Sequence, residues 1–121
     1  MQVSPILRRA SDRYFHWCPA CEEMHPLFDR APWTFNGDVN KPTFSPSFKH
    51  GGLRCVNVNG KWTGEWVRDA NGIPVDGTCH YIITDGRIQF CPDSWHKRSD
   101  IVAMPPIPSH LVDSFAIETQ D

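Results

Sequence analysis

The chain has 121 residues, 40% of them hydrophobic and 12% aromatic, which fits one folded domain and excludes a disordered chain. Its 14 acidic and 12 basic residues give a net charge of −2, so no basic excess indicates nucleic acid as a partner. No apolar run approaches the roughly 18–20 residues of a membrane span, and residues 1–10 lack a signal-like apolar stretch, so we expect a cytoplasmic protein.

Eleven prolines and eight glycines argue against long helices and favour strands, turns and ordered loops. We therefore expect a mainly β fold, with a small α+β fold as the alternative. The expected architecture is a compact, loop-rich antiparallel sheet with a zinc-ribbon-like knuckle. A single zinc-binding domain is expected over residues 1–121, with its core at about 14–106 and a C-terminal tail at 109–121.

The first half of the chain places aromatic residues beside a cysteine pair. Residues 14–28 surround the turn from Cys18 to Cys21, and residues 29–50 are expected to be an ordered loop with short strands. Pro42 and Pro46 predict that this second stretch is not a central strand, because proline cannot donate to a β-ladder.

Two hairpins are expected further along the chain. Residues 53–58 alternate as a strand does, and Asn59 and Gly60 form a turn before the partner strand. The segment CHYIITDGRIQFC (79–91) is the second hairpin, turning at Asp85 and Gly86. Its register places Tyr81, Ile83, Ile88, Phe90 and Cys79 on one face, which we take as core, and His80 with Cys91 on the other. Residues 101–108 are expected to be a last strand that ends in prolines.

The cysteines indicate a metal site. An odd number, five, in a chain without an export signal disfavours a disulfide framework. Cys18 and Cys21 have the two-residue spacing of a zinc knuckle and supply two of the four tetrahedral ligands that structural zinc requires. The residues alone leave open which side chains supply the other two ligands. The candidates are Cys79 with His96, or the cross-strand pair of His80 with Cys91.

The remaining candidates have simpler interpretations. Cys55 is expected to be a small buried hydrophobe. His16 and His110 have no partner in the sequence and are expected at the surface or partly buried. Asp93 is interpreted as a turn residue, or as the carboxylate that orients His96 in the metal site.

Several motifs in combination carry a family resemblance. They are Cys18–Cys21 with His25, Trp33, Asn36–Asp38, the PTFSPS segment 42–47, Cys79 with His80, the DGRIQF segment 85–90, Asp93 and His96. Together they resemble a family of small, poorly characterised metal-binding proteins of tailed phages and prophages. Relatives of that family occur in bacterial gene clusters for ubiquitin-like conjugation. Members are often labelled ammonia monooxygenase, a label that nothing in this sequence supports.

The resemblance covers residues 14–106 and implies which residues form the site. The family pattern has an aliphatic residue where this chain has Cys91, which implies Cys79 and His96 as the second pair of ligands. It also implies that His25, His80 and Asp93 lie near the metal. It says nothing about residues 53–78, a segment that is longer here than in the family pattern.

Two functional hypotheses follow. In the first, zinc has a structural role, because a thiolate-rich ligand set is typical of closed sites, and the protein acts through a phage or host protein partner. In the second, the chain is a zinc-dependent hydrolase that uses His25, His80, Asp93 and His96. The HExxH motif and the HxE half of the deaminase signature are both absent. A nucleic-acid-binding zinc ribbon is a third class, and the acidic net charge counts against it.

Overall fold

The computed structural model describes residues 1–111, and its strands pair only in the antiparallel sense within that range. The predicted mainly β class is confirmed. The amino-terminal sheet has the order β1-β2-β3, formed by β1 (Arg8–Ala10), β2 (Arg13–Cys18) and β3 (Glu23–Leu27).

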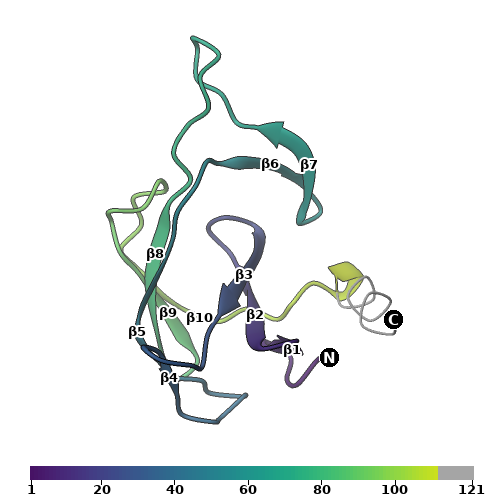
Figure 1. Ribbon diagram of the computed structural model, residues 1–121, viewed down its shortest axis with the longest axis vertical. Coiled ribbons are helices and arrows are strands. Elements are labelled where there is room, and N and C mark those ends of the chain that lie inside the picture. Colours follow the sequence, from purple (N-terminus) through teal and green to yellow (C-terminus); the bar gives the residue numbers. More distant parts are fainter. Residues whose placement is uncertain (112–121) are drawn as a thin grey trace.

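A larger sheet has the order β10-β9-β8-β5-β4. Its strands are β4 (Thr34–Phe35), β5 (Phe44–His50), β8 (Cys79–Thr84), β9 (Arg87–Phe90) and β10 (Ile101–Ala103). The third sheet is the hairpin of β6 (Cys55–Val58) and β7 (Lys61–Trp66), which projects from the body of the molecule (Figure 1).

The hydrophobic core lies where the amino-terminal sheet meets the larger sheet. Apolar side chains from both sheets are almost completely removed from solvent, and they are Leu7, Cys18, Leu27, Phe44, Phe48, Cys79, Tyr81, Ile83, Ile88, Phe90 and Met104. Each fully buried side chain of this size stabilises the fold by about 1.5–3 kcal/mol. In β8 and β9, where the strands alternate their faces regularly, the residues next to the core positions are half-buried or exposed.

The β8–β9 hairpin has the predicted register. Thr84 pairs with Arg87, Ile83 with Ile88 and Tyr81 with Phe90. Asp85 and Gly86 have φ values of 51° and 74°, as the tight turn requires. Cys79 points into the core, whereas the side chain of His80 is 23% exposed on the opposite face.

The expectation that Pro46 bars its segment from the interior of a sheet is wrong. β5 contains Pro46 and lies between β8 and β4. The register between β5 and β8 shifts between Phe44 and Phe48, so Pro46 falls in an irregularity where no ladder hydrogen bond is needed from it. The same irregularity contains Ser47.

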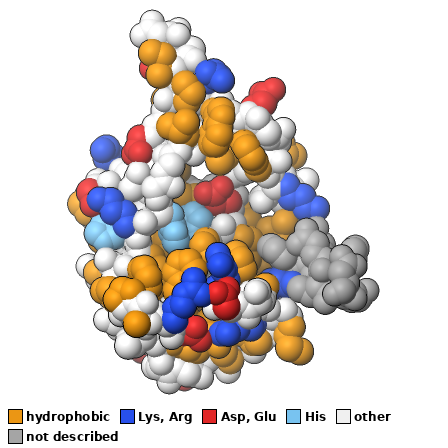
Figure 2. All heavy atoms as spheres, viewed as in Figure 1, with side chains coloured by type: hydrophobic (Ala, Val, Ile, Leu, Met, Phe, Trp, Pro, Cys, Tyr) orange, Lys and Arg blue, Asp and Glu red, His pale blue; other side chains and the backbone are white. Residues whose placement is uncertain are grey.

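The projecting β6–β7 hairpin is anchored at its turn. Asn59 and Gly60 form the predicted turn, with φ values of 53° and 78°. A Cβ on Gly60 would lie 2.7 Å from Trp17 Cζ3, so only glycine fits this approach. Figure 2 shows hydrophobic side chains along the projecting part, where Trp62, at 54% exposure, reaches solvent.

Residues 109–111 begin a helical turn, and the rest of the tail expected at 109–121 lies outside the described residues. Within residues 1–111, no helix is long and apolar enough to cross a membrane.

Candidate catalytic triad and metal site

A serine, a histidine and an aspartate form a hydrogen-bonded chain on the outer face of the larger sheet. Ser47 Oγ lies 2.9 Å from His80 Nε2, and His80 Nδ1 lies 3.0 and 3.1 Å from the two carboxylate oxygens of Asp93. These distances are those of a nucleophile, a base and an orienting group in hydrogen-bond reach. The triad is recognised from this geometry, since its order along the chain, Ser-His-Asp, differs from that of well-known serine hydrolases.

Neighbouring strands place Ser47 beside His80. Lys49 of β5 is the direct partner of His80 in β8, so their side chains share the solvent face. Ser47 precedes Lys49 by two residues and lies in the β5 irregularity. Bulges of this kind redirect a side chain next to active sites, which here brings the serine hydroxyl to the imidazole.

The segment after β9 holds Asp93 in place. The hydroxyl of Ser94, buried at 1% exposure, accepts a hydrogen bond from the His80 amide at 2.9 Å and donates to the carbonyl of Cys91 at 2.7 Å. Because Ser94 is bonded to the backbone of His80 in β8 and of Cys91 just after β9, its neighbour Asp93 is held against the imidazole.

Asp93 is the exposed member of the triad. Its hydrogen bond with His80 is the main cause that lowers the pKa of the carboxyl group, and Lys49 Nζ, 3.5 Å away, acts in the same direction. The carboxylate is 52% exposed, so solvent screens its charge. Asp93 is therefore ionised at neutral pH and can orient the imidazole.

Three thiols meet on the core side of β8. The pair Cys18 and Cys21 lies at the β2–β3 turn, and the thiols of both interact with that of Cys79. The Cys21 amide donates to Cys18 Sγ at 3.4 Å, and the indole N–H of Trp95 donates to Cys21 Sγ at 3.3 Å. N–H donors directed at sulfur are what thiolates require.

The charge state of the thiols fits a bound cation. Hydrogen bonds with Cys21 and Cys79 lower the pKa of Cys18 to about 4. Contacts with Cys18 and Cys21 raise the pKa of Cys79, because a second negative charge so close to the first is unfavourable. A divalent cation removes this conflict, since it binds deprotonated thiols. These side chains could therefore hold a metal ion.

Two histidines are candidates for the fourth ligand of a metal ion held by the three thiols. His96 Nε2 lies 3.3 Å from Cys79 Sγ, while His25 offers a ring nitrogen within 4.8 Å of the sulfurs of Cys18 and Cys21. Burial lowers the pKa of His96 and so favours the neutral ring that binds metal. Burial also acts to lower the pKa of His25, but contacts with Cys21 and Glu23 outweigh it and raise that pKa.

A hydrogen bond to the other ring nitrogen bears on the same choice. The Arg98 amide donates to His96 Nδ1 at 3.1 Å, so a neutral ring carries its proton on Nε2, and zinc at Nε2 would require this contact to be given up. On His25 the nitrogen assignment is reversed. Nε2 lies 3.3 Å from the Glu23 carboxylate, which leaves Nδ1 as the acceptor. The ring hydrogen bonds thus favour His25 as the fourth ligand, whereas the short distance to Cys79 favours His96.

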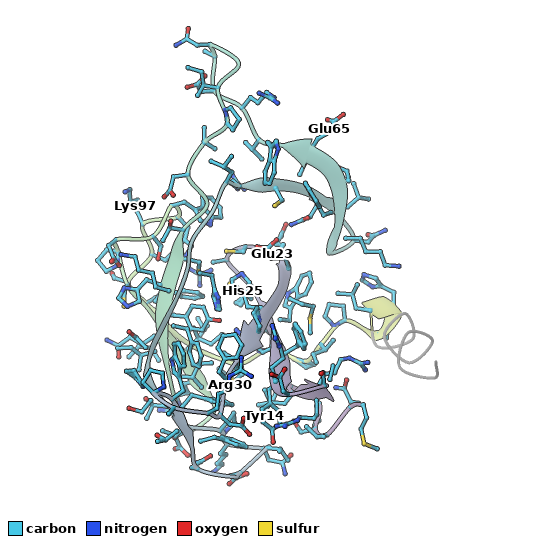
Figure 3. All side chains as sticks on the ribbon, viewed as in Figure 1. Tyr14, Glu23, His25, Arg30, Glu65 and Lys97 are labelled. Carbon is cyan, nitrogen blue, oxygen red and sulfur yellow. The ribbon has the colours of Figure 1, made fainter. Side chains whose placement is uncertain are left out.

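The hydroxyl of Tyr81 is the centre of a buried histidine cluster between the two sheets. It lies 2.6 Å from His16 Nε2, 2.8 Å from His50 Nε2 and 3.4 Å from His25 Nδ1. Figure 3 shows His25 pointing from β3 toward the larger sheet. His16 is thus buried and bonded to Tyr81, which corrects the expectation that it lies at the surface or partly buried without a partner.

A cavity continues the outer face of the sheet beyond the triad. It has a volume of about 370 Å³ and is lined by Ile82, Thr84, Asp85, Arg87, Gln89 and Ile101. Ile82 follows His80 by two residues and shares its face of β8. The cavity therefore lies on the same face of the sheet as the triad, although no triad residue is among those that line it.

The structure groups the sequence candidates into two sites. Cys18, Cys21, Cys79 and His96 meet on the core side of β8, and His25 lies with them. His80 and Asp93 meet on the outer face, away from His25 and His96, so the four residues of the hydrolase hypothesis do not share a site.

The sequence did not indicate Ser47 as a site residue, and it wrongly predicted that Cys55 is buried. Ser47 lies in the PTFSPS segment 42–47, but no spacing rule links a serine to a histidine 33 residues away. The expectation that Cys55 is buried is wrong, because the residue is only partly buried in the projecting hairpin.

The fold and the site define a small β protein that combines a serine-histidine-aspartate triad with a cysteine-histidine cluster. Residues 3–91 match the model of a family described as bacterial ubiquitination-like system serine protease, BubE. The chain belongs to this family, which agrees with the resemblance to proteins of bacterial ubiquitin-like conjugation clusters. Comparison with curated proteins and with solved structures finds no match.

Proposed function

We propose that the chain is a serine protease of a bacterial ubiquitination-like system, with Ser47 as nucleophile, His80 as general base and Asp93 as the orienting carboxylate. The observation that carries the proposal is the continuous hydrogen-bonded chain from Ser47 Oγ through both ring nitrogens of His80 to Asp93. The family description supports the same reaction class.

The geometry supports acyl transfer. His80 Nε2 takes the proton of Ser47 as its oxygen attacks the carbonyl carbon of the substrate, and Asp93 accepts the hydrogen bond from Nδ1–H. The imidazolium then gives its proton to the leaving amine, and an acyl group remains on Ser47. A water molecule, deprotonated by His80, releases the acid product and restores the serine hydroxyl.

The substrate is proposed to lie along the solvent face of β8 and β9. The cavity lies on the triad's face of the sheet and is lined by two isoleucines, Ile82 and Ile101, together with polar and charged residues such as Arg87. Concave sites that combine apolar walls with a few polar groups are where ligands bind. The acyl or leaving segment of a protein substrate would occupy this cavity.

Zinc is proposed to be held by Cys18, Cys21, Cys79 and His96, with His25 as the competing fourth ligand. When bound, zinc supplies a cross-link between the β2–β3 turn and the strand that carries His80. Binding of this kind contributes directly to folding in small domains. The protein partner expected from the sequence, of phage or host origin, stays a prediction.

Peptide hydrolysis with matched variants tests the protease proposal. The probes are a fluorogenic peptide library and a p-nitrophenyl ester, and the variants are Ser47→Ala and Ser45→Ala. Ser45 is an exposed serine of the same strand and is the control. We expect hydrolysis by the wild type and by Ser45→Ala, and loss in Ser47→Ala. Equal activity of Ser47→Ala and the wild type would refute the proposal.

A further inference from the structure

A second group of metal-ligating side chains lies at the triad itself. His80, Cys91 and Asp93 each offer one ligand atom, and these three atoms lie within 4.8 Å of one another. An imidazole nitrogen, a thiolate and a carboxylate are all zinc ligands. The group lies on the solvent side of β8, opposite the cluster of Cys18, Cys21 and Cys79.

We propose that His80, Cys91 and Asp93 form an inhibitory site for zinc, whose occupation switches off the serine nucleophile. The inference rests on the proposed function, because inhibition requires that His80 activates Ser47. It assigns a role to Cys91, which has no part in the catalytic chain or in the cluster of three thiols.

The spacing of the three ligand atoms suits one ion. Ligands held at about 2.0–2.3 Å from zinc in tetrahedral geometry lie about 3.5 Å apart. His80 Nδ1 and Asp93 are already 3.0 Å apart, and the strand pairing holds Cys91 beside His80, with the Cys91 amide donating to the His80 carbonyl at 3.0 Å. Small side-chain rotations therefore suffice to close the site.

Binding is incompatible with catalysis through either ring nitrogen. If zinc takes Nδ1 of His80, the single proton of the neutral ring moves to Nε2, which then donates to Ser47 and can no longer accept its proton. If zinc takes Nε2, it replaces the contact with the serine hydroxyl. In both cases Cys91 loses its thiol proton to solvent on binding.

The ion can reach the site from solvent. Cys91 is partly buried, and Asp93 and His80 are 52% and 23% exposed. The ammonium group of Lys49, 3.5 Å from Asp93 and itself 58% exposed, can turn into solvent when a cation arrives. The fourth position of the ion is left to water.

A site with three protein ligands and a water molecule is also the form of a catalytic zinc centre. That alternative predicts the opposite effect, because added zinc would then raise hydrolysis. The sign of the response to zinc therefore separates the two interpretations.

Metal content tests the site without reference to activity. The wild type, Cys91→Ser and the control Cys55→Ser are dialysed against buffers of rising free zinc, and bound zinc per chain is measured. We expect Cys91→Ser to bind one zinc fewer than the wild type and than Cys55→Ser. Equal zinc content of all three proteins at every concentration would overturn the proposal, whether or not the chain is a protease.

Hydrolysis of the p-nitrophenyl ester tests the consequence. Loss of a group that only supports a ligand costs about 10–100-fold in metal affinity, so loss of a ligand is expected to raise the half-inhibiting zinc concentration about 100-fold or more. We expect this shift in Cys91→Ser, with its activity before zinc is added unchanged, and no shift in Cys55→Ser. Activation by zinc, or equal inhibition of all three proteins, would contradict the inference.

Discussion

Cys79 and His80 are consecutive residues of β8, and their side chains leave opposite faces of the sheet into different sites. Cys79 Sγ contacts His96 on the core side, while His80 Nε2 contacts Ser47 on the solvent side. Because a strand alternates its faces, the position of one side chain fixes that of the other. We therefore expect a disturbance of the thiol cluster to reach the triad, because one peptide unit joins the two residues.

Removal of zinc should consequently reduce both stability and activity. The change is Cys79→Ser, or treatment of the wild type with a strong chelator. We expect a lower Tm and loss of hydrolysis together, because the cross-link between the β2–β3 turn and β8 is lost. Calorimetry and the ester assay measure the two effects. A chelated protein that keeps its Tm and its activity would rule out the structural zinc.

The fourth zinc ligand can be identified with two single variants. His96→Ala and His25→Ala are compared by the zinc retained after dialysis against a weak chelator. We expect His96→Ala to lose zinc and His25→Ala to retain it, because His96 Nε2 lies 3.3 Å from the third thiol. The reverse result would assign the position to His25.

The exposed carboxylate of Asp93 should support catalysis by orienting the imidazole of His80. Asp93→Ala is expected to lower kcat by roughly 10²–10⁴-fold with a smaller effect on KM, because the imidazole loses the group that holds Nδ1–H. Asp76, in the loop before β8, supplies a carboxylate control outside the triad, and Asp76→Ala should retain activity. An unchanged kcat in Asp93→Ala would show that Asp93 is not the orienting carboxylate of the triad.

Tyr81 should be a stabilising residue. Tyr81→Phe leaves buried nitrogens of His16 and His50 without their hydroxyl partner, which should lower the free energy of unfolding by about 1–3 kcal/mol. Tyr14→Phe, at the other tyrosine of the chain, should change it by no more than about 0.5 kcal/mol. Urea denaturation measures both. Equal stabilities of the two variants would contradict this role.

Acid should destabilise the fold through His50. Burial, and then the nearby His25, lower the pKa of His50 to about 3, while in the unfolded chain it is about 6.5. Between these values the unfolded state binds a proton that the folded state does not, so stability falls as pH drops below about 6.5. One such group gives a slope of at most about 1.4 kcal/mol per pH unit.

The matched variant for this pH dependence is His50→Gln, which cannot titrate. Between about pH 6.5 and pH 4, its free energy of unfolding should fall less steeply than that of the wild type, measured by denaturation at each pH. Parallel slopes would show that His50 does not carry the effect.

The sequence predicted local features well where one short segment determined them. The β8–β9 register followed from Asp85 and Gly86 together with alternating apolar residues, and it correctly separated Cys79 from His80. The cysteine spacing likewise drew attention to the turn at Cys18. In each case turn chemistry and periodicity act over a few residues.

Features that depend on tertiary contacts could not be predicted in this way. Pro46 was expected to keep its segment out of the sheet interior, yet a register shift accommodates it and places Ser47 beside His80. His16 was expected at the surface or partly buried, because its buried partner, Tyr81, is 65 residues away. A serine nucleophile has no spacing signature comparable with that of the cysteine pair, so the triad appears only once β5 and β8 are paired.

The most direct test of Ser47 as the activated nucleophile is covalent labelling by a fluorophosphonate. The labelled residue is mapped by mass spectrometry of the intact protein and its peptides. Such a reagent phosphonylates a serine that is activated by a neighbouring base. We expect one adduct on Ser47, absent in Ser47→Ala, unchanged in Ser45→Ala and formed much more slowly in His80→Ala. Labelling of a different serine, or a rate that is the same in His80→Ala and the wild type, would contradict it.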